Sequence, residues 1–395
     1  MAPHFKKMEK LGHEQVVYCS DPLAGLRAII AIHSTALGPA LGGTRMWPYK
    51  KEKEALEDVL RLSRGMTYKA AAAGLNFGGG KAVIIGDPKK DKSERLFRSF
   101  AAFIARMKGA FITGEDVGID VNDMEFMFME TDYVMGLSKG HGGSGDPSPL
   151  TAYGVVQGMK ACVEKKLKRK TLRGLTVAVQ GLGHVGANLV KLLAAEGVKV
   201  IATDIDEIAA AKLKKECGIK MVESNHIYSV SCDIFSPCAL GGILNSKTIP
   251  KLKCEIVAGA ANNQLRGDSD GVLLHKRGIL YAPDYVINAG GLMNVSLELE
   301  GYSEARARTL IRSIYYNLKR IFQISEDQKI MTHEAADHLA EERIINVSRI
   351  KRGNFLSKSK IRRRLISPEK ANDRDIEFPL STTIKKVSTT IKKAG

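Results

Sequence analysis

GMTYKAAAAGLNFGGGKAVIIG, residues 65–86, combines two lysines, Lys69 and Lys81, with small side chains and three consecutive glycines. The amphipathic run before Lys69 predicts a helix over residues 52–66, with Lys69 near its C-terminal end. Lys81 leads into Ala-Val-Ile-Ile, which predicts a buried strand. Gly78–Gly80 can adopt positive φ without steric cost, which allows backbone and ligand to approach closely. The stretch therefore places two lysines at one site between a helix and a strand.

Two ammonium groups in one partly buried site would each lower the pKa of the other, and desolvation would act in the same direction. A lysine near neutrality can act as a general base, whereas a charged lysine can hold a substrate carboxylate. The alternative is a pair of solvated surface lysines beside a glycine turn, because lysine is mostly an exposed residue. Composition alone does not separate these two interpretations.

The bulk composition predicts two domains and a tail. The chain has 395 residues, of which 44% are hydrophobic, and this exceeds one ordinary domain. No apolar run is long enough to cross a bilayer, and residues 1–12 lack the apolar core of a secretory signal. The six cysteines show no CxxC pair or metal-ligand spacing, so we expect reduced thiols and no metal site. These features predict a cytoplasmic protein without membrane contact.

Most of the formal net charge of +17 lies at the C-terminal end. Residues 349–395 hold fourteen Lys and Arg against four Asp and Glu, a net +10. From residue 354 the tail contains KSKIRRR and an imperfect heptad duplication, and its low apolar content and like charges predict disorder. Residues 354–395 are therefore either a basic arm that contacts a polyanion such as nucleic acid, or a solvated extension.

The apolar pattern predicts an α/β protein with two domains. Two alternating runs, Val16–Cys19 and Leu26–His33, predict an antiparallel pair of strands, and residues 93–110 predict an amphipathic helix. Residues 140–149 are rich in glycine and proline and suggest a hinge. Beyond them strands and helices alternate, which is typical of a doubly wound, Rossmann-type parallel sheet. The elements expected there are strands at residues 175–179, 198–203, 234–235, 255–258 and 279–281, and helices at residues 185–195, 208–217 and 304–347.

VQGLGHVG, residues 179–186, follows an apolar strand and opens a helix, as a dinucleotide-binding loop does. Gly181 permits the tight turn, Gly183 allows the pyrophosphate to approach, and Gly186 lets the helix pack closely on the strand. The helix N-terminus offers free N–H groups to the phosphates. Asp204, at the end of the next strand, can accept hydrogen bonds from the adenosine ribose and would repel a 2′-phosphate, which favours NAD over NADP.

Neighbouring residues leave alternatives for these roles. His184 and Val185 open the helix beside the phosphates, and His184 is expected to face solvent. Asp206 is the rival of Asp204 at the ribose. Glu207 is expected at the start of the following helix.

Several longer motifs occur in a recognisable order. They are GPALGGTRMW (38–47), RGMTYKAAAAGLNFGGGKAVIIGDP (64–88), TGEDVG (113–118), ETDYV (130–134), GDPSPLTAYGV (145–155), VQGLGHVG (179–186), CDIFSPCALG (232–241) and APDYVINAGGLMNV (282–295). With these motifs the sequence resembles the glutamate/leucine/phenylalanine/valine dehydrogenase family of amino-acid dehydrogenases, and within it the leucine dehydrogenases, over about residues 13–350.

The resemblance implies a domain organisation and a reaction. Residues 1–140, completed by a helix at about residues 333–353, would form the substrate-binding and catalytic domain. Residues 141–332 would form the Rossmann-type dinucleotide-binding domain, and family members form closed oligomers. The implied reaction is the reversible oxidative deamination of an L-amino acid with NAD as hydride acceptor.

The resemblance also implies catalytic roles. Lys69 would hold the substrate α-carboxylate, Lys81 would activate water, and Asp116 would carry protons to and from the amino nitrogen. On physical grounds alone Glu115 is as good a candidate as Asp116. The presence of all three catalytic residues argues against a nucleotide-binding protein that has lost catalysis.

On the cofactor side the resemblance assigns Thr151 to the nicotinamide carboxamide. Asn262 would touch both nicotinamide and substrate, and Asn288 would line the cleft between the domains. Ala239 and Ala261 complete the expected cofactor-binding set.

The positions around the substrate side chain favour an apolar amino acid. Leu41 stands where glutamate dehydrogenases have a lysine that pairs with the γ-carboxylate, and a buried carboxylate without a partner costs several kcal/mol. Val295 replaces a serine of those enzymes, and Gly42 is expected to contribute backbone around the substrate. Gly114 replaces an alanine of leucine dehydrogenases and opens space, whereas Leu292 replaces a valine and takes space. We expect branched-chain L-amino acids as substrates, with phenylalanine as the alternative, since glycine at 114 is similar to phenylalanine dehydrogenases.

Overall fold

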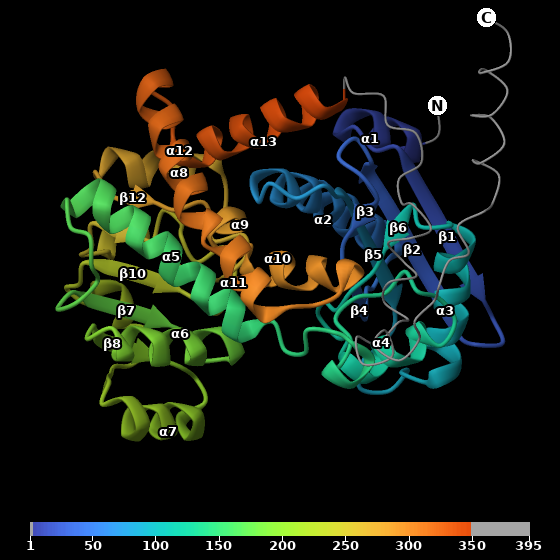
Figure 1. Cartoon of the computed structure of the whole chain (residues 1–395), viewed down its shortest axis with the longest axis horizontal. Helices are drawn as coiled ribbons and strands as arrows, with labels where there is room; N and C mark the ends of the chain where they lie inside the picture. Colours follow the sequence, from blue (N-terminus) through green and yellow to red (C-terminus); the bar gives the residue numbers. More distant parts are fainter. Residues whose placement is uncertain (1–2, 349–395) are drawn as a thin grey trace, which may run out of the picture.

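The computed structural model describes residues 3–348 and contains two α/β parts, each built on its own six-stranded sheet (Figure 1). The first sheet comprises β1 (Gln15–Asp21), β2 (Leu26–Ser34), β3 (Ala40–Leu41), β4 (Thr44–Trp47), β5 (Gly78–Ile85) and β6 (Phe111–Ile112). Its strand order is β1-β2-β5-β3-β6, and β4 also pairs with β5. The antiparallel pair expected near the N-terminus is confirmed as β1 and β2.

Helices cover both faces of the first sheet because its central strands alternate their side chains. α2 (Glu52–Ala72) packs Leu56 and Leu60 against Ile29 and Val83 on one face. α3 (Glu94–Arg106) and α4 (Val121–Phe128) cover the other face, where Phe97 and neighbouring side chains of these helices meet the alternate residues of β2 and β5. The expected helix over residues 93–110 is thus confirmed, with ends a few residues inside the expected range.

The three consecutive glycines adopt a conformation different from the expected one. Gly78–Gly80 lie within β5, and none of them has positive φ. A Cβ on Gly79 would lie 2.1 Å from the backbone nitrogen of Thr67 on α2, and a Cβ on Gly80 would lie 2.7 Å from the ring of Phe111 on β6. The glycines are therefore required by close packing of neighbouring elements on an extended strand, and not by a turn.

α2 carries Lys69 in its last turn, as expected, but the helix continues six residues beyond the expected end. Two buried histidines bind the same helix to the sheet: His33 lies on β2, and His13 lies just before β1. His33 Nδ1 shares a hydrogen bond with Thr67 Oγ1 at 2.8 Å, and His13 Nε2 shares one with Ser63 Oγ at 2.9 Å. The two imidazole rings lie 4.9 Å apart between their centroids. Burial, with a contribution from His13, lowers the pKa of His33 to about 4.

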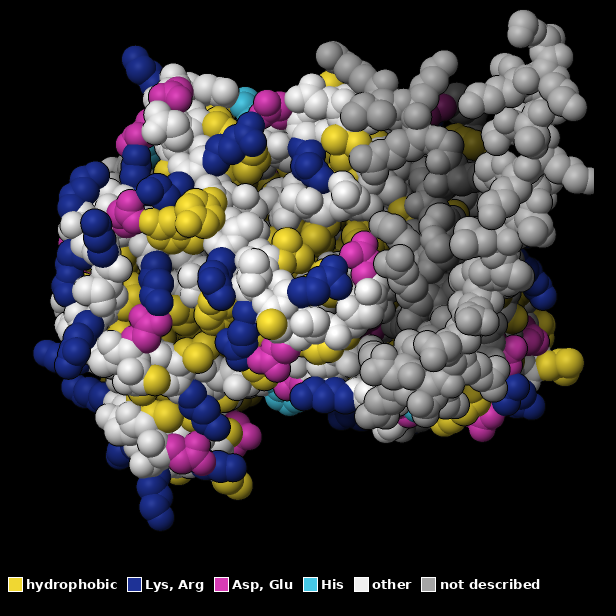
Figure 2. Space-filling view, viewed as in Figure 1, with side chains coloured by type: hydrophobic (Ala, Val, Ile, Leu, Met, Phe, Trp, Pro, Cys, Tyr) yellow, Lys and Arg dark blue, Asp and Glu magenta, His cyan; other side chains and the backbone are white. Residues whose placement is uncertain are grey.

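The second sheet is parallel throughout, as the alternating pattern predicted, with the order β12-β11-β10-β7-β8-β9. Its strands are β7 (Thr176–Gln180), β8 (Lys199–Thr203), β9 (Lys220–Met221), β10 (Ile234–Pro237), β11 (Ile256–Val257) and β12 (Leu280–Tyr281). β9 was not expected from the sequence. α5 (Ser148–Leu167), α6 (His184–Ala195) and α12 (Ser313–Gln328) cover one face, and η2 (Ile227–Ser229), η3 (Ile249–Lys251) and α8 (Asp268–Lys276) cover the other. Figure 2 shows Lys and Arg side chains distributed over the second part, on the side where α5 and α12 lie.

The helical region expected at residues 304–347 consists of three helices, α11 (Glu304–Ile311), α12 and α13 (Thr332–Ser348). α12 ends at Gln328, and the following residue, Lys329, has a left-handed conformation with φ of +55°. α13 returns to the first part, where the Tyr68 hydroxyl of α2 donates to Glu341 Oε1 at 2.8 Å and Arg343 Nη2 donates to the Gly74 carbonyl at 3.0 Å. The exact domain limits near residues 140 and 332 stay predictions.

The basic tail at residues 354–395, and with it the predicted polyanion contact, lies outside the described residues. Within residues 3–348 no helix combines the length and the apolar character that a membrane crossing requires. The same residues contain no group of three or more His, Cys, Asp or Glu side chains that could hold a metal ion. All six cysteines are free thiols.

Candidate active site

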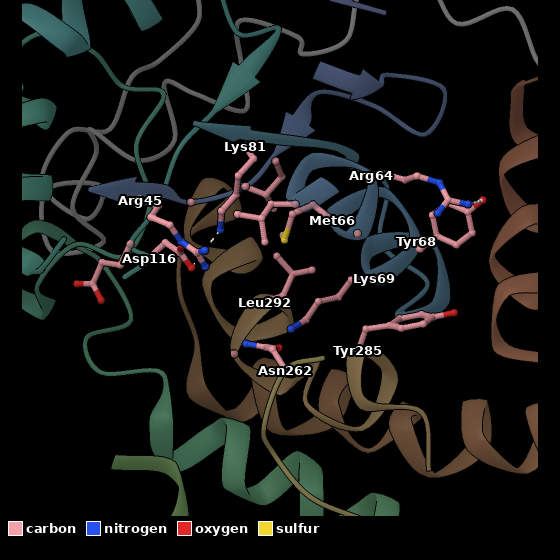
Figure 3. A pocket seen from close by; sticks show the side chains of 18 of the residues that line it. Arg45, Arg64, Met66, Tyr68, Lys69, Lys81, Asp116, Asn262, Tyr285 and Leu292 are labelled. Atoms are coloured by element: carbon pink, nitrogen blue, oxygen red, sulfur yellow. Dashed lines mark hydrogen bonds and ion pairs between the residues drawn. The ribbon is translucent and has the colours of Figure 1, made fainter. Parts of the chain in front are cut away.

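A cavity of about 490 Å³ lies where α2, β5 and the segment after β6 face α9 (Asp284–Ile287) and α10 (Gly290–Ser296). In Figure 3 the side chain of Lys81 extends toward Asp116, and that of Lys69 toward Asn262. Every residue expected on the catalytic and substrate side lines this cavity: Leu41, Gly42, Lys69, Lys81, Gly114, Asp116, Asn262, Leu292 and Val295. The structure thus brings together residues that lie up to about 250 positions apart in the sequence.

Lys81 and Asp116 form a buried ion pair at one end of the cavity. Lys81 Nζ lies 3.1 Å from Asp116 Oδ1, and Arg45 Nε donates to Asp116 Oδ2 at 2.7 Å. Burial lowers the pKa of Lys81, although the charge of Asp116 opposes this effect. Burial alone would raise the pKa of Asp116, but Lys81 and Arg45 outweigh it and hold that pKa below its usual value. The pair therefore combines a lysine of lowered basicity with an ionised carboxylate.

Lys69 occupies the middle of the cavity and connects the two α/β parts. Its ammonium donates to Asn288 Oδ1 at 2.7 Å, and Asn288 Nδ2 donates to Asn262 Oδ1 at 2.7 Å. Burial lowers the pKa of Lys69 to about 8, with the charge of Asp284 opposing and that of Lys81 adding to the effect. Lys69 thus remains mostly charged at pH 7. The interpretation of Lys69 and Lys81 as solvated surface lysines is wrong.

Glu115 and Asp116 have different surroundings, although both line the cavity. Burial, together with neighbouring acidic groups that include Asp120 and Asp146, raises the pKa of Glu115 to about 7. Its Oε1 has no hydrogen-bond partner among the described residues. Asp116 is the carboxylate in contact with Lys81. The geometry therefore separates two neighbours that the sequence alone did not.

Apolar side chains enclose the part of the cavity around Gly114. Leu41, Met135, Leu292 and Val295 belong to one hydrophobic cluster. Met135 is completely buried and lines the cavity, but sequence reasoning missed it because the recognised motif ETDYV ends one residue earlier. A Cβ on Gly114 would lie 3.5 Å from the Met135 carbonyl oxygen, an ordinary van der Waals distance. Glycine at this position thus leaves space that an alanine could fill.

The glycine-rich loop after β7 has the geometry that a dinucleotide pyrophosphate requires. Gly181 has φ of +99°, and a Cβ on Gly186 would lie 2.0 Å from the Gly181 carbonyl oxygen. Gly183 is exposed, with no heavy atom within 4 Å of an added Cβ, so a ligand can approach its backbone. His184 begins α6 and faces solvent, as expected, and Val185 is half-buried beside it.

Asp204 holds the segments around this loop together. Its carboxylate accepts hydrogen bonds from the backbone nitrogens of Leu182 and, at 2.8 Å, Asp206. A carboxylate has further lone pairs, so it can still accept from a ribose. The Asp206 side chain caps α7 (Glu207–Cys217), which begins at Glu207 as expected. The geometry therefore favours Asp204 over Asp206 as the ribose ligand.

Other expected cofactor residues extend from the loop toward the cavity. Ala239 packs on Gly181, where an added Cβ would lie 2.7 Å from the Ala239 side chain. Thr151 lies on α5 against Gly291 of α10, and its hydroxyl donates to the Pro147 carbonyl at 2.9 Å. Ala261 is buried, and it directly precedes the cavity residue Asn262 in the sequence.

Two residues near the loop were not expected from the sequence. Ile205 and Leu240 are apolar yet 92% and 75% exposed, and they directly follow Asp204 and Ala239. At these positions beside the loop, the two side chains would suit the faces of an adenine base. Together with the open backbone at Gly183, these residues fit a bound dinucleotide.

Comparison with known proteins agrees with this geometry. Residues 13–133 match the sequence model described as Glu/Leu/Phe/Val dehydrogenase, dimerisation domain, and residues 142–207 and 203–352 match that of Glutamate/Leucine/Phenylalanine/Valine dehydrogenase. The chain is 56% identical to leucine dehydrogenase of Geobacillus stearothermophilus over 86% of its length and 93% of the relative. It is 49% identical to phenylalanine dehydrogenase of Caldalkalibacillus thermarum over 86% of its length and 93% of that relative.

Solved structures show the same likeness. The crystal structure of L-tryptophan dehydrogenase from Nostoc punctiforme superposes with a TM-score of 0.78 at 48% identity, and it covers 88% of this chain and 100% of that one. A hetero-hexameric glutamate dehydrogenase from Thermus thermophilus shares the fold, with a TM-score of 0.73 at 24% identity over 87% of this chain and 91% of that one. The lysine-rich cavity, the dinucleotide loop and these matches over most of the chain lead to one conclusion: this protein belongs to the glutamate/leucine/phenylalanine/valine dehydrogenase family.

Proposed function

We propose that this protein catalyses the NAD-dependent, reversible oxidative deamination of branched-chain L-amino acids to 2-oxo acids and ammonia. The observation that carries the proposal is the Lys81–Asp116 pair, with 3.1 Å between Nζ and Oδ1, in the same cavity as the Lys69 ammonium and an apolar side-chain pocket. The similarity to leucine dehydrogenases, at 53–56% identity for the relatives compared, supports it.

The side chains divide the chemistry of this reaction among them. The charged Lys69 binds the substrate carboxylate and fixes the Cα–H bond in one direction. NAD, when bound, accepts the hydride from Cα. Asp116 takes the proton from the amino nitrogen, and Lys81, which burial makes less basic, removes a proton from the water that attacks the resulting imine carbon. Asp116 then returns its proton to the nitrogen of this adduct, and ammonia leaves as the adduct hydroxyl loses its proton and becomes the carbonyl of the 2-oxo acid.

The apolar pocket supports a branched aliphatic side chain as the preferred substrate. Leu41, Leu292 and Val295 offer no charge to a γ-carboxylate, whose burial without a partner would cost several kcal/mol. The space beside Gly114 keeps phenylalanine as the alternative substrate within the same reaction.

We further propose NAD rather than NADP as the cofactor, because the Asp204 carboxylate at the loop would repel a 2′-phosphate. The match of residues 13–133 to a dimerisation domain supports a homo-oligomer. The cytoplasmic location stays a prediction from the sequence.

The test is the rate of reduced-cofactor formation with NAD or NADP and leucine, isoleucine, valine, phenylalanine or glutamate. Turnover should be fastest with the branched aliphatic amino acids and NAD, and Lys81→Ala should lose a factor of about 10²–10⁴ in kcat/KM. Lys92→Ala is the matched control, since Lys92 also forms ion pairs with carboxylates, those of Asp120 and Asp123, but lies outside the cavity. A folded wild-type protein that turns over none of the five amino acids would contradict the proposed function.

A further inference from the structure

Charged side chains of alternating sign run from the buried Lys81 to the exposed Arg61, and both of these residues line the cavity. Lys81 Nζ lies 3.1 Å from Asp116 Oδ1, and Asp116 Oδ2 accepts from Arg45 Nε at 2.7 Å. Arg45 Nη1 continues to Asp58 Oδ2 at 2.9 Å, and Asp58 Oδ1 accepts from Arg61 Nη2 at 2.8 Å. The side chain of Lys81 is 7% exposed, those of the three middle residues are 17–21% exposed, and that of Arg61 is 56% exposed. We call these five residues the charge chain.

The charge chain is built from separate elements of the first sheet and its helix. Lys81 lies on β5, Arg45 on β4, and Asp58 on α2, while Asp116 follows β6. The Tyr49 hydroxyl also donates to Asp58 Oδ2, at 2.6 Å, so this carboxylate is held from three directions. The side chains of Arg45 and Asp58 are only 20% and 17% exposed. Ion pairs screened from water in this way influence their neighbours far more strongly than surface pairs do.

We propose that Arg45 and Asp58 are positioning residues that set the pH range in which the Lys81–Asp116 pair transfers protons. Neither residue needs to touch the substrate's reacting atoms for this role, because both act through the pair. The inference rests on the proposed function and deepens it, since it concerns how the same site is tuned.

Arg45 acts on the pair in two ways. Its hydrogen bond occupies Asp116 Oδ2 and leaves Oδ1 directed at Lys81, which fixes the orientation of the carboxylate. Its positive charge lowers the pKa of both Asp116 and Lys81. Removing that charge should therefore raise both pKa values.

Asp58 acts in the opposite sense because it carries the opposite charge. It raises the pKa of Lys81, and it partly neutralises Arg45. Other charged groups near the pair are Lys69 on α2, the neighbouring Glu115, and Asp284 on α9, which acts through Lys69. These groups remain in place when Arg45 or Asp58 is changed, so they cannot account for opposite effects of the two changes.

The test compares Arg45→Gln with Asp58→Asn in the full-length enzyme, with kcat/KM for leucine measured against pH at saturating NAD. Oxidative deamination needs a neutral Lys81 and an ionised Asp116, so its acid limb follows the pKa values of the pair. The acid limb should move up by about one pH unit in Arg45→Gln and down, by a smaller amount, in Asp58→Asn. Arg98→Gln is the matched control, because this surface arginine also bridges two carboxylates, Glu94 and Glu130. It should leave the acid limb in place.

A readout that needs no turnover separates this inference from the proposed function. The pH dependence of Lys81 labelling by trinitrobenzenesulfonate, followed by mass spectrometry, should show the same two shifts of opposite sign. Shifts in the same direction in both variants, or no shift in either, would overturn the inference if thermal unfolding shows that the variants fold. If the wild-type enzyme is inactive but the two variants still shift the pH dependence of Lys81 labelling in opposite directions, the proposed function alone is overturned.

Discussion

Replacing Gly114 with alanine tests the size of the side-chain pocket. The added methyl group would lie 3.5 Å from the Met135 carbonyl oxygen, and Gly114 does not have positive φ, so alanine fits without backbone strain. The variant therefore folds as before but has less room beside Leu292 and Val295. One methylene of misfit in an apolar pocket changes the transition-state free energy by about 1–3 kcal/mol, a factor of about 10–200 in rate. This loss should apply to phenylalanine, the larger substrate, and only weakly to leucine.

The assay is the ratio of kcat/KM for phenylalanine to that for leucine, in wild type and Gly114→Ala. The ratio should fall about tenfold or more in the variant. Gly267→Ala provides the control, since Gly267 is exposed, has no heavy atom within 4 Å of an added Cβ, and lies outside the cavity. An unchanged or increased ratio would refute the assignment of this part of the cavity to the substrate side chain.

Two further predictions concern stability. The pKa of His33 is about 4 in the folded protein, below the ordinary value of 6.5, so between these values the unfolded chain binds the proton more readily. Stability present above pH 6.5 is therefore lost as the pH falls toward 4, by about 2 kcal/mol at pH 5. The drop in the urea midpoint from pH 7.5 to 5 should be smaller in His33→Gln, and an equal drop would contradict the prediction. Gly65→Ala should stabilise the protein by about 0.5–1 kcal/mol, because Gly65 lies inside α2 and no heavy atom lies within 4 Å of an added Cβ. The check is a higher Tm, and a lower one would show that the glycine has a packing role.

Helices and strands in which apolar residues recur at regular spacing could be predicted from the sequence. Elements whose limits depend on the backbone conformation of a single residue, or that are very short, could not. β1 and β2 alternate over several residues, and the parallel strands of the second part follow the expected ranges closely. β9 has only two residues, too few to show an alternation of apolar and polar side chains. The break after α12 depends on Lys329 in a left-handed conformation, and a lysine gives no turn signal in the sequence.

Those residues of the candidate site that lie within recognised sequence motifs could be predicted. The motifs identified residues on both sides of the cavity, because each motif combines residue types that suit one role, such as binding the dinucleotide or the substrate. Arg45 was within a recognised motif but received no role, and Met135 lay just beyond one. Their contribution depends on the direction in which each side chain points in the folded protein, and segments far apart in the sequence decide that direction only when they pack together. The same holds for Glu115 and Asp116, whose different surroundings follow from their positions in the folded sheet.

The three extended glycines of β5 also limit how this protein can change over evolutionary time. Gly79 packs directly on the backbone of α2, and Gly78 and Gly80 pack on other neighbours of β5, so α2 and β5 keep their spacing as long as these glycines are retained. Lys69 and Lys81 lie on these elements, so descendants inherit their spacing together with the fold. Leu292 and Val295 lie on α10, outside this constraint, and can be exchanged one at a time. Substrate preference can therefore diverge while the reaction persists, in line with the leucine, tryptophan and phenylalanine dehydrogenases among the relatives of this chain.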